Sequence, residues 1–226
     1  MKKIFFILIA FVLFCPQACK TDKSEKAVIH AIDVSLTDAE KAGGILTPEI
    51  LWKYGRIGTI ALSPDGSTVL YTVTNYDLPT EERTTCIFSV PAEGGNAVNL
   101  TPEGGSGPQW IENGAKIAYI SGSKVMVMNA DGSAKKEITG LQDFEILSFS
   151  PAGDMVFFTR RVKLDQTANE KYNLPNAKVR IIDDMMYRHW NTWSDYSYSH
   201  VFIATFDGAA ISNEKDIMEG QRFDAP

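Results

Sequence analysis

The feature that most constrains the fold of this chain is a short strand–turn–strand pattern that occurs three times. Each copy has an apolar strand start, a glycine-containing turn and a second strand in which aliphatic and aromatic residues alternate. The copies are Ile60–Thr72, Trp110–Ile120 and Phe149–Thr159. Their turn glycines Gly66, Gly114 and Gly153 lie 48 and 39 residues apart. A repeat of roughly 40–50 residues indicates one supersecondary unit per copy, stacked on its neighbours.

The turns predict tight hairpins. In Ser63–Gly66, Pro64 presets φ for the first corner, Asp65 caps its own backbone, and Gly66 accepts positive φ. Each copy is followed by a third apolar stretch, a further turn and a weaker fourth strand. Four antiparallel strands with short connections make one propeller blade. We therefore expect an all-β partial β-propeller of about three four-stranded antiparallel blades, with a short N-terminal helix; an antiparallel sandwich is the alternative.

The expected blades cover residues 57–104, 105–142 and 143–219, within a propeller region of residues 47–226. The chain has 226 residues, of which 44% are apolar, so it can bury a sizeable core. Its 22 basic and 28 acidic residues leave it mildly acidic, which argues against nucleic acid as a partner.

The first 19 residues have the pattern of an export signal. Lys2 and Lys3 precede an apolar run from Ile4 to Phe14, which is too short to cross a roughly 30 Å hydrocarbon core as a helix. Cys19, followed by a polar tether and leader over residues 20–46, resembles a lipoprotein signal. We expect an exported, periplasmic protein that meets the membrane only through its signal or a lipid on Cys19; simple cleavage or an uncut anchor are the alternatives.

A short helix is expected just before the first blade, within Thr47–Gly55. Thr47 is a suitable cap, Pro48 suits the first turn, and Gly55 is a suitable stop. We expect Leu51 and Trp52 to pack onto the propeller.

The third copy of the repeat carries a long insertion. Its second and third strands are separated by residues 161–199, whereas about ten residues or fewer separate them in the other copies. Connections of this length inside a compact repeat are uncommon and are usually functional. The insertion also holds the densest set of polar and aromatic residues, Ile181–His200.

These residues carry a family resemblance. Ser63–Gly66 after the Leu51–Trp52 helix, and above all Tyr187–Trp190 with Trp193, Asp195 and His200, resemble the N-terminal propeller of the prolyl oligopeptidase family. The bacterial dipeptidyl aminopeptidase and acylaminoacyl peptidase branch is the most similar. Where members often have Asp after the first Trp and Gly after the later Asp, this chain has Asn191 and Tyr196.

The resemblance implies a two-part enzyme, in which the propeller is stacked on an α/β-hydrolase domain with a Ser, Asp, His triad. The 226 residues contain no Gly-x-Ser-x-Gly motif, because Pro108 occupies the last position of the nearest candidate, around Ser106. We expect no catalytic residue within this chain, no cofactor and no metal site. The hydrolase domain and peptide substrates are the implied partners.

Six residues of the insertion are candidates for substrate binding: Asp183, Asp184, Arg188, His189, Trp190 and Trp193. The acidic pair resembles, in position, the pair of dipeptidyl peptidases, and a carboxylate is the natural counter-charge for an α-ammonium group. Each candidate also has a structural reading. The acidic pair could be solvated, Arg188 could pair with Asp195 inside the loop, and the tryptophans could pack on the blade face.

The resulting hypothesis is the substrate-gating propeller of an exported serine peptidase that removes short N-terminal units from peptides. A stand-alone periplasmic propeller acting as a binding or scaffold module is the alternative. A sialidase-like propeller is disfavoured, because Asp and Gly are adjacent in Asp65–Gly66 and Asp131–Gly132 rather than separated by one residue.

Overall fold

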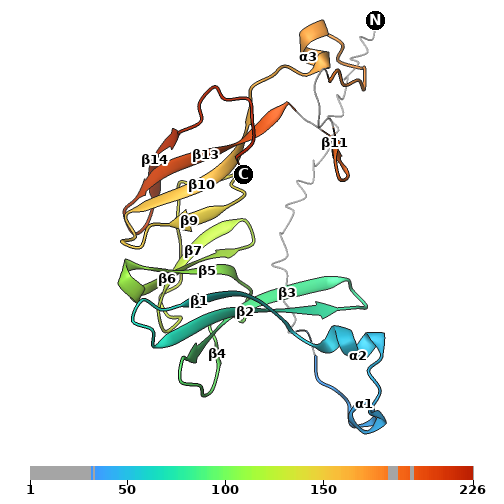
Figure 1. Ribbon diagram of the computed structural model, residues 1–226, viewed down its shortest axis with the longest axis vertical. Coiled ribbons are helices and arrows are strands. Elements are labelled where there is room, and N and C mark those ends of the chain that lie inside the picture. Colours follow the sequence, from blue (N-terminus) through green and yellow to red (C-terminus); the bar gives the residue numbers. More distant parts are fainter. Residues whose placement is uncertain (1–31, 33, 183–187, 194–195, 226) are drawn as a thin grey trace, which may run out of the picture. The chain divides into compact units, whose positions relative to one another are not determined.

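Three consecutive four-stranded antiparallel sheets make up most of the chain (Figure 1). The computed structural model describes residue 32 and residues 34–182, 188–193 and 196–225. The first sheet contains β1 (Arg56–Leu62), β2 (Thr68–Asp77), β3 (Glu82–Pro91) and β4 (Val98–Asn99). The second contains β5 (Ser106–Ile111), β6 (Lys116–Ser121), β7 (Lys124–Asn129) and β8 (Lys136–Glu137). The third contains β9 (Leu147–Phe149), β10 (Met155–Lys163), β13 (Ser197–Phe206) and β14 (Ile211–Asp216).

The turn chemistry expected from the sequence is present in the first hairpin. The Asp65 carboxylate accepts hydrogen bonds from the Ser63 hydroxyl (2.5 Å) and the Ser67 amide (3.0 Å). These hydrogen bonds lower the pKa of Asp65 to about 2. Gly66 has φ +75° and Gly153, in the third hairpin, has φ +74°, a region that favours glycine. The repeated turns therefore set the hairpins as predicted.

The second sheet is buried on both faces because successive side chains of β6 point in opposite directions. Ile117 and Tyr119 pack with Leu70 and Ile87 of the first sheet. Ala118 packs in a second cluster with residues of the third sheet, such as Phe158. Two apolar layers thus separate three sheets, with one layer on each side of β6.

The first strands of successive sheets lie next to one another, β1 beside β5 and β5 beside β9. Trp110 of β5 donates from its indole nitrogen to the carbonyl oxygen of Ala61 (3.1 Å). Gln109 donates to the carbonyl oxygen of Leu147 (2.7 Å) and accepts from the amide of Phe149 (3.0 Å). Sheets stacked in this way are blades of a β-propeller, which confirms the predicted all-β fold.

The expected helix is present as α2 (Pro48–Lys53), with Thr47 as its N-cap. Its packing was predicted correctly in part: the Trp52 ring contacts the Tyr76 ring of β2 edge-on, with centroids 5.1 Å apart, but Ile50 is the buried residue and Leu51 is 47% exposed. Gly55 is not the stop, because the helix ends at Lys53 with Tyr54 as its C-cap. Gly55 is needed for a close approach instead, since a Cβ there would clash with the side chain of Val73 in β2.

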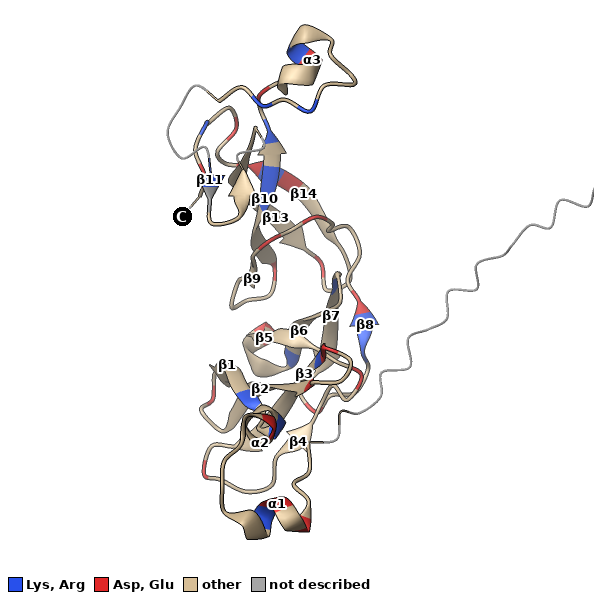
Figure 2. Cartoon of the chain, turned by 90° about the vertical axis from the view of Figure 1, so that its right-hand side faces the viewer, with Lys and Arg blue, Asp and Glu red and all other residues tan. Residues whose placement is uncertain are grey.

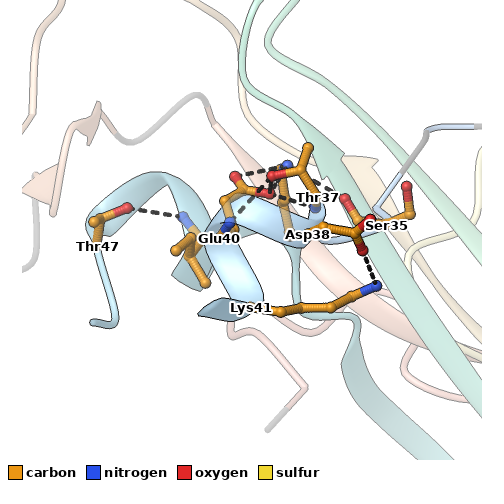
Figure 3. Close-up of polar contacts among 8 residues, drawn as sticks. Ser35, Thr37, Asp38, Glu40, Lys41 and Thr47 are labelled. Carbon is orange, nitrogen blue, oxygen red and sulfur yellow. Dashed lines mark hydrogen bonds and ion pairs between the residues drawn. The ribbon is translucent and has the colours of Figure 1, made fainter. Parts of the chain in front are cut away.

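A second helix, α1 (Asp38–Gly43), lies in the segment that was expected to be a tether and leader. Thr37 and Glu40 form a reciprocal capping box, which the sequence pattern Thr-x-x-Glu could have indicated. Figure 3 shows these contacts, with Lys41 turned toward Asp38. Glu40 also accepts from Lys53 of α2 (2.9 Å), and these hydrogen bonds lower its pKa to about 2.

Candidate functional site

The insertion begins where the longest hairpin of the third sheet ends. β10 and β13 pair without interruption from Met155 with Thr205 to Lys163 with Ser197. The strands therefore extend further than the sequence predicted, and residues 164–196 lie between them rather than 161–199. The pairing of β10 with β13 therefore fixes the two ends of the insertion next to each other.

Helix α3 (Ala168–Tyr172) is the first element of the insertion. Thr167 and Glu170 form a capping box, and Glu170 also accepts a hydrogen bond from Lys163 at the end of β10 (2.7 Å). The hydrogen bonds from Lys163 and Thr167 lower the pKa of Glu170 to about 2. The short helix is therefore tied to the strand that precedes it. Figure 2 marks the positions of Lys and Arg in blue along β10 and in α3.

A pocket of about 680 Å³ lies against this helix, and we call it the insertion pocket. Its lining comes from the end of β10, from α3, from residues 181–182, from β13 and from the chain after β14. The lining residues are Leu164, Asp165, Gln166, Ala168, Lys171, Tyr172, Ile181, Ile182, Tyr196, Tyr198 and Arg222. This volume is in the range of small-ligand sites.

Tyr196 holds two walls of the insertion pocket together. Its hydroxyl lies 3.2 Å from both the amide nitrogen and the carbonyl oxygen of Ile181. Its carbonyl oxygen accepts hydrogen bonds from the amides of Leu164 (3.3 Å) and Asp165 (3.4 Å). The backbone of Tyr196 has φ +66°, a region that costs a residue with a Cβ about 1–2 kcal/mol. A strained backbone next to a pocket is a recurrent mark of functional sites.

An ion pair between Asp165 and Arg222 forms another wall. The Asp165 carboxylate also accepts a hydrogen bond from the Tyr198 hydroxyl (3.2 Å). Its negative charge is therefore already paired within the wall.

The chain after β14 runs beside the start of β13 and carries Arg222 to the pocket. Ser199 donates its amide to the Asp224 carboxylate and accepts from the Ala225 amide, both at 2.7 Å. The fully buried ring of His200 contacts the Asp216 carboxylate (2.7 Å) and the Gln221 carbonyl oxygen (2.8 Å). These contacts fix the segment that presents Arg222.

Of the sequence-predicted candidates, the described Arg188, Trp190 and Trp193 are not among the residues that line the insertion pocket. Asp183 and Asp184 lie outside the described residues, as does Asp195, the partner considered for Arg188. The backbone of His189, in β11 (Arg188–His189), pairs with Thr192 of β12 (Thr192–Trp193). The proposed substrate-binding roles therefore stay predictions.

The tryptophans and Arg188 of this hairpin are exposed. Trp190 is 88% exposed at φ +53°, so the expected packing of its ring on the blade face is wrong. Arg188 is exposed and lies over the ring of Trp193, with its guanidinium carbon 5.2 Å from the ring centroid. Arg188 is therefore not buried, whereas its expected pairing with Asp195 stays a prediction, because Asp195 lies outside the described residues.

The pocket residues were missed because no local motif marks them. Only the Thr-x-x-Glu pattern at Thr167 could have indicated α3. Among the residues that the structure describes, no group of three or more His, Cys, Asp or Glu side chains could hold a metal ion. No helix within the described ranges is long and apolar enough to cross a bilayer.

Comparisons with known proteins show what the chain is similar to. No family model matches the sequence. It is 32% identical over 208 residues to dipeptidyl-peptidase 5 of Porphyromonas gingivalis, and 31% identical over 205 residues to that of Porphyromonas endodontalis. These matches cover 88% and 86% of this chain, but only 30% and 29% of the relatives. The chain thus spans about a third of the length of the curated relatives it matches.

Solved structures support the same fold. The acylaminoacyl peptidase of Pyrococcus horikoshii is similar over 74% of this chain and 26% of its own, with a TM-score of 0.55 and 12% identity. An acylaminoacyl peptidase in complex with Z-Gly-Gly-Phe-chloromethyl ketone has the same coverage and identity, with a TM-score of 0.56. These matches support a propeller portion of a prolyl oligopeptidase-family peptidase, and the three sheets have the fold of propeller blades.

Proposed function

We propose that this chain is the substrate-gating propeller of an exported serine peptidase that removes short N-terminal units from peptides. The observation that carries the proposal is its 32% identity over 208 residues to a protein named dipeptidyl-peptidase 5. We assign hydrolysis to an α/β-hydrolase domain, because the sequence of 226 residues contains no Gly-x-Ser-x-Gly motif.

A gating role is supported by the place and size of the insertion pocket. It lies at the end of the β10–β13 hairpin, within the insertion that also contains β11 and β12. A volume of about 680 Å³ can hold a few residues of an extended peptide but no folded domain. A propeller with such a pocket can select short peptides before they reach a catalytic serine.

The test uses two gene products, one that ends at Pro226 and one that includes whatever coding sequence follows Pro226. Both are incubated with dipeptidyl and aminoacyl coumarin amides and with a fluorophosphonate probe for reactive serines. We expect the longer product to release dipeptides and react with the probe, whereas the shorter product does neither. A longer product that is inert in both assays would contradict the proposal and favour a binding or scaffold module.

A further inference from the structure

The described residues that line the insertion pocket carry a net positive formal charge, opposite in sign to that of the whole chain. The chain has a formal net charge of −6, but the charged lining consists of Lys171, Arg222 and Asp165. Asp165 already receives the Arg222 guanidinium and the Tyr198 hydroxyl. One positive charge is therefore left over in the lining, and it comes from α3.

Lys171 supplies that charge. Its ammonium nitrogen lies 5.4 Å from the centroid of the Tyr172 ring, and it forms no ion pair with any residue that the structure describes. Arg222 contacts Asp165 through one terminal nitrogen, which leaves further N–H donors on its guanidinium group. The lining thus offers cationic donors and no unpaired carboxylate of its own.

The remaining lining is amphipathic. Three tyrosine rings and the side chains of Ile181 and Ile182 form the walls. Tyrosine presents a large apolar area at low conformational cost and keeps a hydroxyl for hydrogen bonds. Such walls suit an aromatic or aliphatic side chain next to a charged group.

We propose that the insertion pocket binds the carboxylate of a short peptide, with the Lys171 ammonium group as its main counter-charge. Arg222 donates a second hydrogen bond, and the tyrosine walls contact the side chain beside the carboxylate. The proposal rests on the proposed function only in taking a peptide as the ligand. It would make the propeller a selector for short peptides whose far end carries a negative charge.

The pocket is formed before a ligand arrives, which lowers the entropic cost of binding. Tyr196 joins residue 181 to the end of β10. Glu170 joins α3 to Lys163 of the same strand. The contacts of Ser199 and His200 hold the segment that carries Arg222. Lys171 is therefore presented from a tethered helix.

The test measures binding to the full 226-residue chain by isothermal titration calorimetry, without any need for hydrolysis. The probes are the tetrapeptide Ala-Ala-Ala-Phe with a free carboxylate, the same peptide as its C-terminal amide, and the amide with Glu in place of the third alanine. We expect the amide to bind roughly tenfold more weakly than the acid, because it loses charge-assisted hydrogen bonds. Added salt should weaken the acid more than the amide.

The three peptides also separate two sources of the carboxylate. If the Glu-containing amide binds as tightly as the free acid, a side-chain carboxylate suffices; if it does not, the pocket reads the C-terminus. Equal binding of the acid and the plain amide would overturn the proposal. The proposal would also be overturned if none of the three peptides binds.

Lys171→Gln provides the matched variant, since Lys171 is exposed and its loss should not unfold the chain. We expect Lys171→Gln to reduce the preference for the acid to near unity, and Lys171→Arg to keep it. Lys178→Gln is the control, because Lys178 is exposed in the same insertion and does not line the pocket. Equal losses in both glutamine variants would contradict a role for Lys171.

These outcomes are distinct from failure of the proposed function. The binding assay can fail while the longer gene product still releases dipeptides, in which case the pocket is not a carboxylate site. Conversely, the acid preference can hold in a protein that never reacts with the fluorophosphonate probe.

Discussion

The ring of His200 lies 2.7 Å from the carboxylate of Asp216 through Nδ1 and 2.8 Å from the carbonyl oxygen of Gln221 through Nε2. Both partners can accept hydrogen bonds, so this geometry favours the protonated ring, in which both nitrogens donate. Burial lowers the pKa of His200, but the hydrogen bonds to Asp216 and Gln221 raise it by more, and the net pKa is above its usual range.

This arrangement predicts a stability that decreases as pH rises. A histidine pKa that is raised in the folded state stabilises the fold fully below its unfolded value near 6.5, and the contribution is lost as pH rises through the folded value. We expect urea unfolding of the wild type, followed from about pH 5 to about pH 9, to show this loss.

The variants Asp216→Asn and His200→Gln test the assignment. Each should be destabilised at low pH, and the difference in unfolding free energy from the wild type should shrink toward high pH. A difference that stays constant across this range would mean that His200 is neutral in the folded chain.

A second prediction concerns Gly140, at the junction between the second and third sheets. Thr139 donates to the carbonyl oxygen of Ala209 (3.1 Å) and accepts from the amide of Ile211 (2.8 Å). Gly140 has φ +90°, and a Cβ there would overlap the carbonyl oxygen of Ile211. Gly140→Ala should therefore force the two sheets apart locally.

Gly208→Ala is the matched control, because Gly208 has φ +92° and an open space where a Cβ would lie. Both variants pay for the left-handed backbone, about 1–2 kcal/mol each. Only Gly140→Ala adds the steric clash, so we expect it to lose roughly 2 kcal/mol more. Denaturant unfolding measures both, and equal losses would show that the junction can relax.

The blades were predictable because their signal is local. The turn glycines Gly66 and Gly153 and the strand patterns beside them lie within a few residues of one another. The insertion pocket could not be predicted in this way, because two of its lining residues, Asp165 and Arg222, are 57 positions apart in the sequence. They come together only after β10 has paired with β13. No sequence period encodes that contact.

At Tyr196 the sequence has a tyrosine where members of the family often have glycine, so the sequence alone left the local turn geometry open. The structure has a glycine-like φ of +66° there. The contact of the Tyr196 hydroxyl with Ile181 could not be predicted either, since it depends on how a distant part of the insertion folds back.

A third prediction concerns Cys19, which lies outside the described residues. The apolar run from Ile4 to Phe14 and the polar tether after Cys19 lead us to propose lipidation of this cysteine and attachment to a periplasmic membrane surface. Mass spectrometry of the membrane fraction should find a lipid-modified N-terminus at Cys19. Cys19→Ser should release the protein, whereas Cys15→Ser should not. An unmodified N-terminus at Lys20 or beyond would contradict the proposal.

The last prediction concerns the uncovered face of the first sheet. Ile57, Ile60 and Leu62 of β1 are 70%, 67% and 58% exposed. They lie opposite Val73, Tyr71 and Val69 of β2, so the apolar side chains form one continuous face. Monomeric proteins rarely expose contiguous apolar patches of more than a few hundred Å². We therefore expect the 226-residue chain to self-associate through this face.

Sedimentation over a range of concentrations measures that association. Ile60→Lys should shift the chain toward the monomer, because a charge in the middle of the face opposes its burial. Val179→Lys is the control, since Val179 is also exposed but belongs to the insertion. If the wild-type chain sediments as a monomer at every concentration and melts cooperatively, the face is tolerated in water, and three blades are stable without a cover.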